Sequence, residues 1–250
     1  MDETRPLDET QQAAATDRAP EPLRVLIVFY SRFGTIRELA GQVGEGAMRV
    51  PGTAIDLLEV GDAPCPELQG GATDEAARDR RTALLDRVAR ADALAIGGPA
   101  YFGGPASALK RFFEDLAVAS SATLDRSRPW HHYLFRDKPG AAFVSSATPH
   151  GGNEQALHAL LTMMMHLGML AVTPGQRGPI LEQGAAPYGA TAITGPEGHR
   201  GLSEEEASEA RDLGQRLATV GGWLRAGRAQ ETERLRAATA VRARGFDPSA

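Results

Sequence analysis

The sequence predicts an α/β fold in which a doubly wound parallel sheet of five strands carries helices on both faces. Three observations support this class. Short apolar runs recur along the chain, segments with apolar residues at helical spacing lie between them, and turns rich in Gly or Pro follow most runs. Strands that alternate with helices are joined by right-handed crossovers, which build a parallel sheet covered on both sides.

The first half of the chain supplies three of the strands. Residues 24–30 are a continuous apolar run rich in β-branched residues, as expected of a central strand that is buried on both faces. A helix over 36–50 follows at once, because its apolar residues recur near helical spacing. A second strand over 54–60, a helix over 82–90 and a short buried strand over 92–96 repeat the pattern.

The second half completes the sheet. A helix is expected over 107–116, a strand over 140–145 and a helix rich in Met and Leu over 154–167. The last strand is expected over 170–172. A closing helix is expected over 203–224, because Ser at its start and three Glu in its first turn suit a helix N-terminus.

One domain accounts for most of the chain, over residues 23–224. Residues 1–22 are polar and acidic, contain three prolines and show no period, so we expect a disordered N-terminal arm. Residues 225–250 are rich in Arg and are expected to form a helical or disordered tail, with a contact to a partner as the alternative.

Composition excludes several classes of protein. The formal net charge is −5, which argues against binding nucleic acid through its phosphates. No apolar run approaches the roughly 20 residues that a membrane-spanning helix needs. Cys65 is the only cysteine, so no disulfide can form within the chain. Together with a start that lacks the features of a secretion signal, this predicts a cytoplasmic protein.

The first loop, residues 30–36, leaves the first strand and opens a helix, at the edge of the sheet where α/β proteins bind ligands. A helix N-terminus offers unpaired amides and partial positive charge, Ser31 and Thr35 add hydroxyls, and Gly34 lets the backbone bend. We expect a phosphate here. The alternative is that both hydroxyls merely cap the helix.

The second loop, residues 97–105, follows the third strand and sets Tyr101 and Phe102 between glycines. Exposed aromatic rings at this edge suit a flat heteroaromatic ligand, although both rings could instead pack inward under the loop. The third loop, residues 145–154, follows the fourth strand with hydroxyls, glycines and a His. Three such loops at one edge are far more specific than any one of them.

These motifs resemble the flavodoxin-like WrbA group of NAD(P)H:quinone oxidoreductases. The resemblance rests on residues 30–36 and 98–104, on His150 to Glu154, on His166 to Met169 and on residues 187–191, all in the family's order. It implies bound FMN, NADH or NADPH as electron donor, a quinone as acceptor, and a homo-oligomer, either a dimer or a tetramer.

The resemblance also implies which residues bind the cofactor. The first loop would hold the FMN phosphate, the second would lie against the isoalloxazine ring, and the third would contact the ribityl and pyrimidine side. His166 matches a histidine that can reach the cofactor of a neighbouring subunit, and Trp130 and Phe33 would border the substrate. The cofactor-binding residues so implied are Ser31, Arg32, Phe33, Gly34, Thr35, Ile36, Pro99, Ala100, Tyr101, Phe102, Gly103, Ser146, Ala147, Thr148, Pro149, His150, Gly151 and His166.

Two departures from the family pattern bear on the flavin. Ala100 and Tyr101 stand where the family often has Thr and Arg, which removes a positive charge beside the ring. Pro149 removes a backbone donor from the third loop and His150 adds an imidazole.

The flavin would carry the chemistry, so no catalytic side chain is expected. No metal is expected either, because the adjacent His131 and His132 face different ways and lack further ligands at a suitable spacing. Two other functions stay open. The chain could be an FMN-binding electron carrier without turnover of its own, or an interaction protein that has lost FMN.

Overall fold

The computed structural model describes residues 21–62, 75–123, 134–176 and 185–245. It contains a parallel sheet in which β2, at one edge, is followed by β1, β3 and β5. Their bounds are Thr53–Glu59 for β2, Leu23–Phe29 for β1, Ala93–Tyr101 for β3 and Pro139–Ser146 for β5. The predicted doubly wound α/β class is confirmed.

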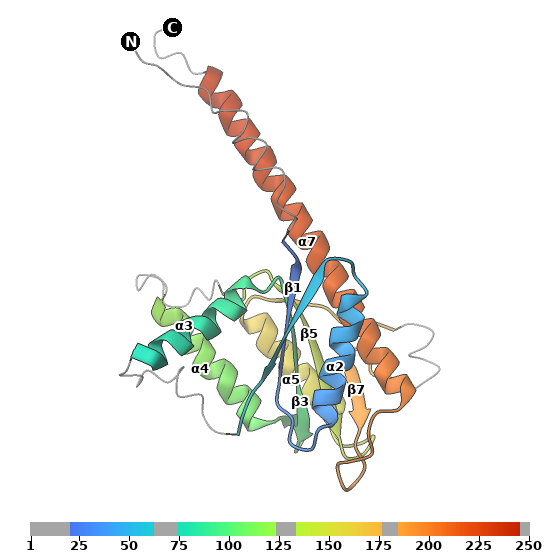
Figure 1. The fold of residues 1–250 in the computed structure, drawn as a ribbon. Helices are drawn as coiled ribbons and strands as arrows, with labels where there is room; N and C mark the ends of the chain where they lie inside the picture. Colours follow the sequence, from blue (N-terminus) through green and yellow to red (C-terminus); the bar gives the residue numbers. More distant parts are fainter. Residues whose placement is uncertain (1–20, 63–74, 124–133, 177–184, 246–250) are drawn as a thin grey trace.

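Helices cover both faces of the sheet (Figure 1). On one face α2 and the first part of α7 pack against each other, and on the other lie α3, α4 and α5. The helix bounds are Thr35–Met48 for α2, Glu75–Arg90 for α3, Ser107–Thr123 for α4, Asn153–His166 for α5 and Glu204–Gly245 for α7.

Alternation along the strands divides the core between the two faces. In β1, Val25 and Ile27 point toward α2 and α7, whereas Leu26 and Val28 point toward the opposite helices. All four side chains are buried, so the strand carries apolar residues at consecutive positions. The continuous apolar run of the sequence follows directly from this two-sided burial.

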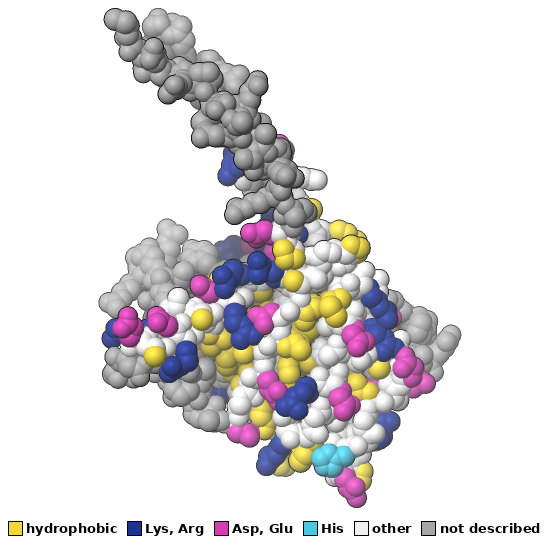
Figure 2. All heavy atoms as spheres, viewed as in Figure 1, with side chains coloured by type: hydrophobic (Ala, Val, Ile, Leu, Met, Phe, Trp, Pro, Cys, Tyr) yellow, Lys and Arg dark blue, Asp and Glu magenta, His cyan; other side chains and the backbone are white. Residues whose placement is uncertain are grey.

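The edge strand β2 is flanked by charged side chains. Arg37 of α2 pairs with Glu59 at 2.7 Å, and Arg87 of α3 pairs with Asp56 at 2.6 Å. On the side of the molecule that Figure 2 shows, apolar side chains are grouped in the middle and charged side chains lie around them. Charges beside an edge strand oppose its pairing with another chain.

The fifth strand differs from the prediction because it is interrupted. β6, Leu170–Ala171, pairs with the start of β5, and β7, Ala190–Ile193, pairs with the end of β5 in the same parallel direction. The sequence predicted only the first piece. The second was not predicted, since β7 is four residues long and lacks a β-branched apolar run.

Three helices are longer than predicted. α3 begins at Glu75 rather than near residue 82, α4 continues past Leu116 to Thr123, and α7 continues past Leu224 to Gly245. The last part of α7 extends away from the body of the domain (Figure 1). Arg225 donates to Pro22 O at 2.8 Å, and Arg228 donates to the carbonyl of Asp137, so two arginines fix α7 where it leaves the sheet.

The predicted second loop, residues 97–105, is instead a hairpin, because β3 continues to Tyr101 rather than ending near residue 96. β4, Gly104–Pro105, pairs antiparallel with the last residues of β3, and Phe102 and Gly103 form the two-residue connection. The predicted arm lies almost wholly outside the described residues, and so do residues 246–250 of the predicted tail. In the part of the chain that the structure describes, no helix is both long enough and apolar enough to cross a membrane.

Candidate functional site

A cleft of about 190 Å³ lies where β1, β3, β5 and β7 end. Residues from all three predicted loops line it: Ser31, Arg32, Phe33, Thr35, Ile36, Pro99, Ala100, Tyr101, Ser146 and Ala147. The loops were predicted to meet because the carboxyl ends of parallel strands share one edge of the sheet. The geometry agrees with that reasoning.

The first loop brings the N-terminus of α2 to the cleft. Gly34 precedes the helix with a φ of 101° and no side-chain cap hydrogen bond is formed there, so a residue with a Cβ would be strained at this position. Ser31 Oγ accepts from the amide of Arg37 at 3.2 Å. Thr35 Oγ1 donates to Gly198 O at 3.4 Å. Ser31 therefore caps one amide of α2, as the alternative prediction had it, while the N-terminus of the helix still faces the cleft.

The second loop exposes its aromatic rings. Tyr101 is 37% exposed and Phe102 is fully exposed, which rules out the alternative that both rings pack inward. Phe102 has a φ of 52°, and Gly103 follows with a φ of 77°. Phe33 of the first loop is 55% exposed, and the guanidinium of Arg32 lies 5.9 Å from its ring centroid. Aromatic faces therefore stand at two sides of the cleft.

The third loop turns away from the cleft after Ala147. Ser146 Oγ donates to Thr148 O at 2.7 Å, and the amide of Gly151 donates to the same carbonyl at 2.9 Å. This tight turn carries the rest of the loop outward. Among the described residues, the predicted binding residues that do not line the cleft are Gly34, Phe102, Gly103, Thr148, Pro149, His150, Gly151 and His166.

His166 and Trp130 are not brought to this cleft. α5 runs back along the sheet, so its last residue, His166, lies near the start of β5 at the opposite edge, where it is exposed. Trp130 lies outside the described residues, as do His131 and His132. A role for His166 in a neighbouring subunit stays a prediction.

A fourth loop, residues 194–200, completes the cleft and was missed in the sequence. The residues that it and β5 add to the lining are Ser145, Thr194, Gly195, Pro196, Glu197 and Gly198. It follows β7, which lies beside β5 and therefore ends at the same edge of the sheet. The available signal was the alternation of Ala190 to Ile193 before a Gly-rich turn, which indicates a short strand.

Tyr30 lies at the end of β1, directly before the first loop. Its hydroxyl donates to Asp62 Oδ1 at 2.5 Å. This hydrogen bond, with burial and the negative charge of Asp62, raises the pKa of Tyr30 to about 12. The phenol therefore stays protonated at physiological pH and supports the loop as a fixed donor. No cluster of potential metal ligands is found among the described residues.

Comparison with known proteins identifies the family of this chain. A profile of the NADPH-dependent FMN reductases matches residues 30–178, which is more than half of the chain. The chain belongs to that family. The match begins at the first loop and includes the second and third, so the family's shared region contains three walls of the cleft.

Curated relatives of this family member extend the likeness over most of the chain. An NAD(P)H dehydrogenase (quinone) of Chromohalobacter salexigens is 34% identical over 209 residues, which cover 80% of this chain and 98% of the relative. A protein of the same description from Solidesulfovibrio magneticus is 34% identical over 213 residues, with coverage of 82% and 100%.

A solved structure agrees with the fold. The crystal structure of a flavodoxin, WrbA-like protein from Agrobacterium tumefaciens matches with a TM-score of 0.52 and 24% identity, over 80% of this chain and 98% of that chain. The flavodoxin-like fold and the resemblance predicted from the sequence are both confirmed.

Proposed function

We propose that this chain is an FMN-dependent enzyme that reduces quinones with electrons from NADH or NADPH. One observation carries the proposal: the N-terminus of α2 opens into the same cleft as the aromatic rings of Phe33 and Tyr101. Gly34 provides no side-chain cap there, and the hydroxyl of Ser31 accepts from one amide of the first turn, that of Arg37. Such a cleft suits a ligand that has a phosphate at one end and a flat ring at the other. The family and the names of the curated relatives support the same reading.

The residues present fit FMN. Thr35 and Ile36, in the first turn of α2, line the cleft. An added Cβ at Gly34, directly before them, would meet no atom within 4 Å, so the start of the helix is not covered by other described parts of the chain. The helix dipole and the amides of its first turn favour an anion at that place. Arg32 lines the same cleft and adds a full positive charge.

The protein's part in the reaction is to bind and orient. When bound, FMN supplies the ability to accept a hydride from NAD(P)H and to pass two electrons to an acceptor. Residues 31–36 would anchor the phosphate, and Ser146 and Ala147 would border the polar side of the ring. Tyr101 and Phe33 would give the nicotinamide and the quinone apolar surfaces on which to stack.

Assembly of several subunits is part of the proposed function. We expect a cytoplasmic homo-oligomer in which His166 of one subunit approaches the flavin of another and Trp130 borders the acceptor. Assembly would account for an exposed His166 far from the cleft of its own chain.

Steady-state turnover tests the proposal. The full chain, loaded with FMN, is mixed with NADH or NADPH and menadione, and oxidation of the nucleotide is followed. We expect oxidation that requires both the flavin and the quinone. Protein that binds FMN but gives no quinone-dependent oxidation with either nucleotide would instead be a flavodoxin-like electron carrier.

A further inference from the structure

The fourth loop is closed on itself by hydrogen bonds between its ends. The amide of Arg200 donates to Thr194 O at 3.0 Å, and that of Gly198 donates to Gly195 O at 3.2 Å. Gly195 and Gly198 have φ values of 73° and 79°, a region that L-residues with a Cβ rarely adopt. The loop therefore has a specific shape.

This loop bridges the first and third loops. At its start, the amide of Thr194 donates to Ser146 O at 2.8 Å. Near its end, Gly198 O accepts from Thr35 Oγ1, and an added Cβ at Gly198 would lie 3.1 Å from the ring of Phe33. The fourth loop thus spans the distance between the proposed phosphate anchor and the loop expected beside the ring.

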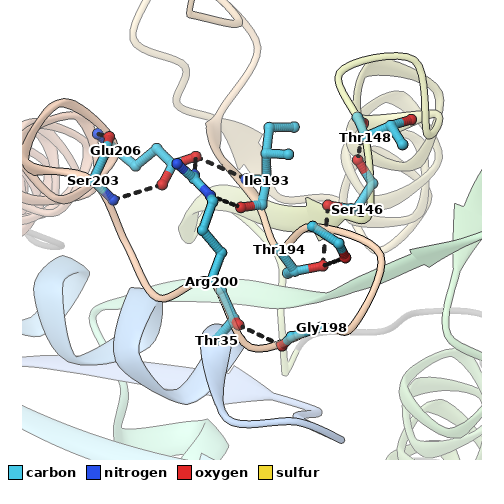
Figure 3. A network of polar contacts seen from close by, with 10 residues as sticks. Thr35, Ser146, Thr148, Ile193, Thr194, Gly198, Arg200, Ser203 and Glu206 are labelled. Carbon is cyan, nitrogen blue, oxygen red and sulfur yellow. Dashed lines mark hydrogen bonds and ion pairs between the residues drawn. The ribbon is translucent and has the colours of Figure 1, made fainter.

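A polar clamp holds the two ends of this loop; it consists of Ile193, Arg200, Ser203 and Glu206 (Figure 3). Glu206 Oε1 accepts from the amide of Ile193 at 2.8 Å and from the guanidinium of Arg200, and Oε2 accepts from the amide of Ser203 at 2.8 Å. Arg200 Nε also donates to Ile193 O at 2.5 Å. The Glu206 side chain is only 14% exposed, so its carboxylate is shielded from water, whereas the guanidinium of Arg200 is 43% exposed and stays partly solvated.

The clamp joins the capping of α7 to the shape of the cleft. Ser203 Oγ accepts from the amide of Glu206 at 3.2 Å, so Ser203 and Glu206 form a capping box at the start of this helix. The same carboxylate fixes Ile193, the residue directly before the loop, and Arg200, the last residue of the loop. A capping box alone needs neither of these two contacts.

We propose that the fourth loop is a further binding element of the flavin site, which contacts the sugar-alcohol chain between phosphate and ring, and that Arg200 and Glu206 are its positioning residues. This inference rests on the proposed binding of FMN in this cleft. The hydroxyl of Thr194 donates to Ser146 O at 3.4 Å and to Gly195 O at 3.2 Å, so the loop offers the oxygen of this hydroxyl as an acceptor. Backbone groups and the carboxylate of Glu197 also lie along the cleft. Hydroxyl groups both donate and accept hydrogen bonds, so a polyhydroxyl chain suits such a mixed polar wall.

The test compares three flavins that differ in the side chain on the ring. FMN carries the sugar-alcohol chain and the phosphate, riboflavin carries the chain alone, and lumiflavin carries a methyl group. Dissociation constants are measured on the full-length apoprotein by quenching of flavin fluorescence. For Glu206→Gln and Arg200→Gln we expect roughly fivefold to thirtyfold weaker binding of FMN and riboflavin, and a change of less than about twofold for lumiflavin.

Glu204→Gln is the matched control. Glu204 lies in the same first turn of α7 and pairs with Arg211, which donates to Gln42 of α2 rather than to the fourth loop. Its removal should leave the affinity for all three flavins within about twofold of the wild type. Thr194→Val leaves the clamp intact and should weaken FMN and riboflavin by about threefold to tenfold.

The outcomes separate the possible failures. If lumiflavin binding weakens as much as FMN binding, the clamp only supports the fold and the inference is overturned. Wild-type affinity for FMN in the clamp variants and in Thr194→Val would also overturn the inference, while leaving the proposed binding of FMN intact. A wild-type chain that takes up none of the flavins would overturn the proposed function itself. Thermal unfolding of each apoprotein shows whether the variants are folded at the temperature of the titration.

Discussion

Phe102 offers a test in which stability and function are expected to change in opposite directions. Its φ of 52° lies in the left-handed region, and its ring is fully exposed at the tip of the β3–β4 hairpin. A bulky residue pays roughly 1–2 kcal/mol for this backbone conformation, whereas Asn adopts it readily. Asn followed by Gly103 is also the preferred pair for a two-residue hairpin whose central residues both have positive φ.

The magnitude for Phe102→Asn follows from two terms. The substitution relieves about 1 kcal/mol of backbone strain, and it loses almost no burial because the ring makes little contact within the chain. The free energy of unfolding should therefore rise by about 1 kcal/mol, equivalent to an increase in Tm of about 2–4 °C for a chain of this size. Urea denaturation of the apoprotein measures it, with the slope unchanged.

Kinetics of the FMN-loaded enzyme give the second half of this test. Phe102 does not line the cleft of this chain, but the family resemblance sets its ring against the flavin. Loss of this stacking should raise KM for menadione roughly threefold to tenfold. Phe102→Ala is the control, because it removes the ring but keeps a Cβ at the strained position. Alanine should give the kinetic loss without the gain in stability. A lower free energy of unfolding for Phe102→Asn would refute the reasoning, since it would mean that the ring is packed.

Three further predictions concern Gly34 directly before α2, Gly46 within α2 and a carboxyl of α7. Gly34→Ala should weaken FMN binding at least about tenfold and cost about 1–2 kcal/mol of stability, measured by flavin titration and urea denaturation, because φ is 101°; unchanged affinity would contradict the phosphate anchor. Gly46→Ala should cost about 1–3 kcal/mol or more in urea denaturation, because the new Cβ would lie 1.8 Å from Arg211 O; a neutral result would contradict the α2–α7 packing. Burial and nearby Glu206 and Asp212 raise the pKa of Glu209 to about 7, so wild-type stability should fall as pH rises from about 4.5 through 7. Glu209→Gln should lose this pH dependence, and its free energy of unfolding, measured by urea denaturation, should exceed that of the wild type by on the order of 1–2 kcal/mol at pH above 7. This value is discounted because the carboxyl is partly solvated. Parallel pH profiles of the variant and the wild type would contradict the prediction.

The sequence predicted β1 well because the burial of this strand is two-sided. Val25 to Val28 are all buried, which gives a continuous apolar run that no exposed segment would carry. β7 escaped prediction for the opposite reason. Only Ala190 and Ala192 of its four residues are buried, and a small alternating strand between turns has little hydrophobic signal.

The same difference explains which walls of the cleft were predicted. Three loops could be placed because each follows a strand that the sequence revealed, and the fourth was missed together with β7. The far position of His166 follows from topology, since a helix that crosses back over a parallel sheet ends at the edge opposite the ligand. The turn at Ser146 depends on a local hydrogen bond to Thr148 O, which sequence patterns do not specify.

The most direct test of the proposed reaction follows the visible absorbance of the FMN-loaded protein without oxygen, in two rapid-mixing steps. Addition of NADH or NADPH should bleach the oxidised flavin, and a subsequent equivalent of menadione should restore its full absorbance, with two electrons transferred in each step. Protein-bound flavin that neither nucleotide bleaches, or that stays bleached in the presence of the quinone, would contradict the assignment of this chain as an NAD(P)H-dependent quinone reductase.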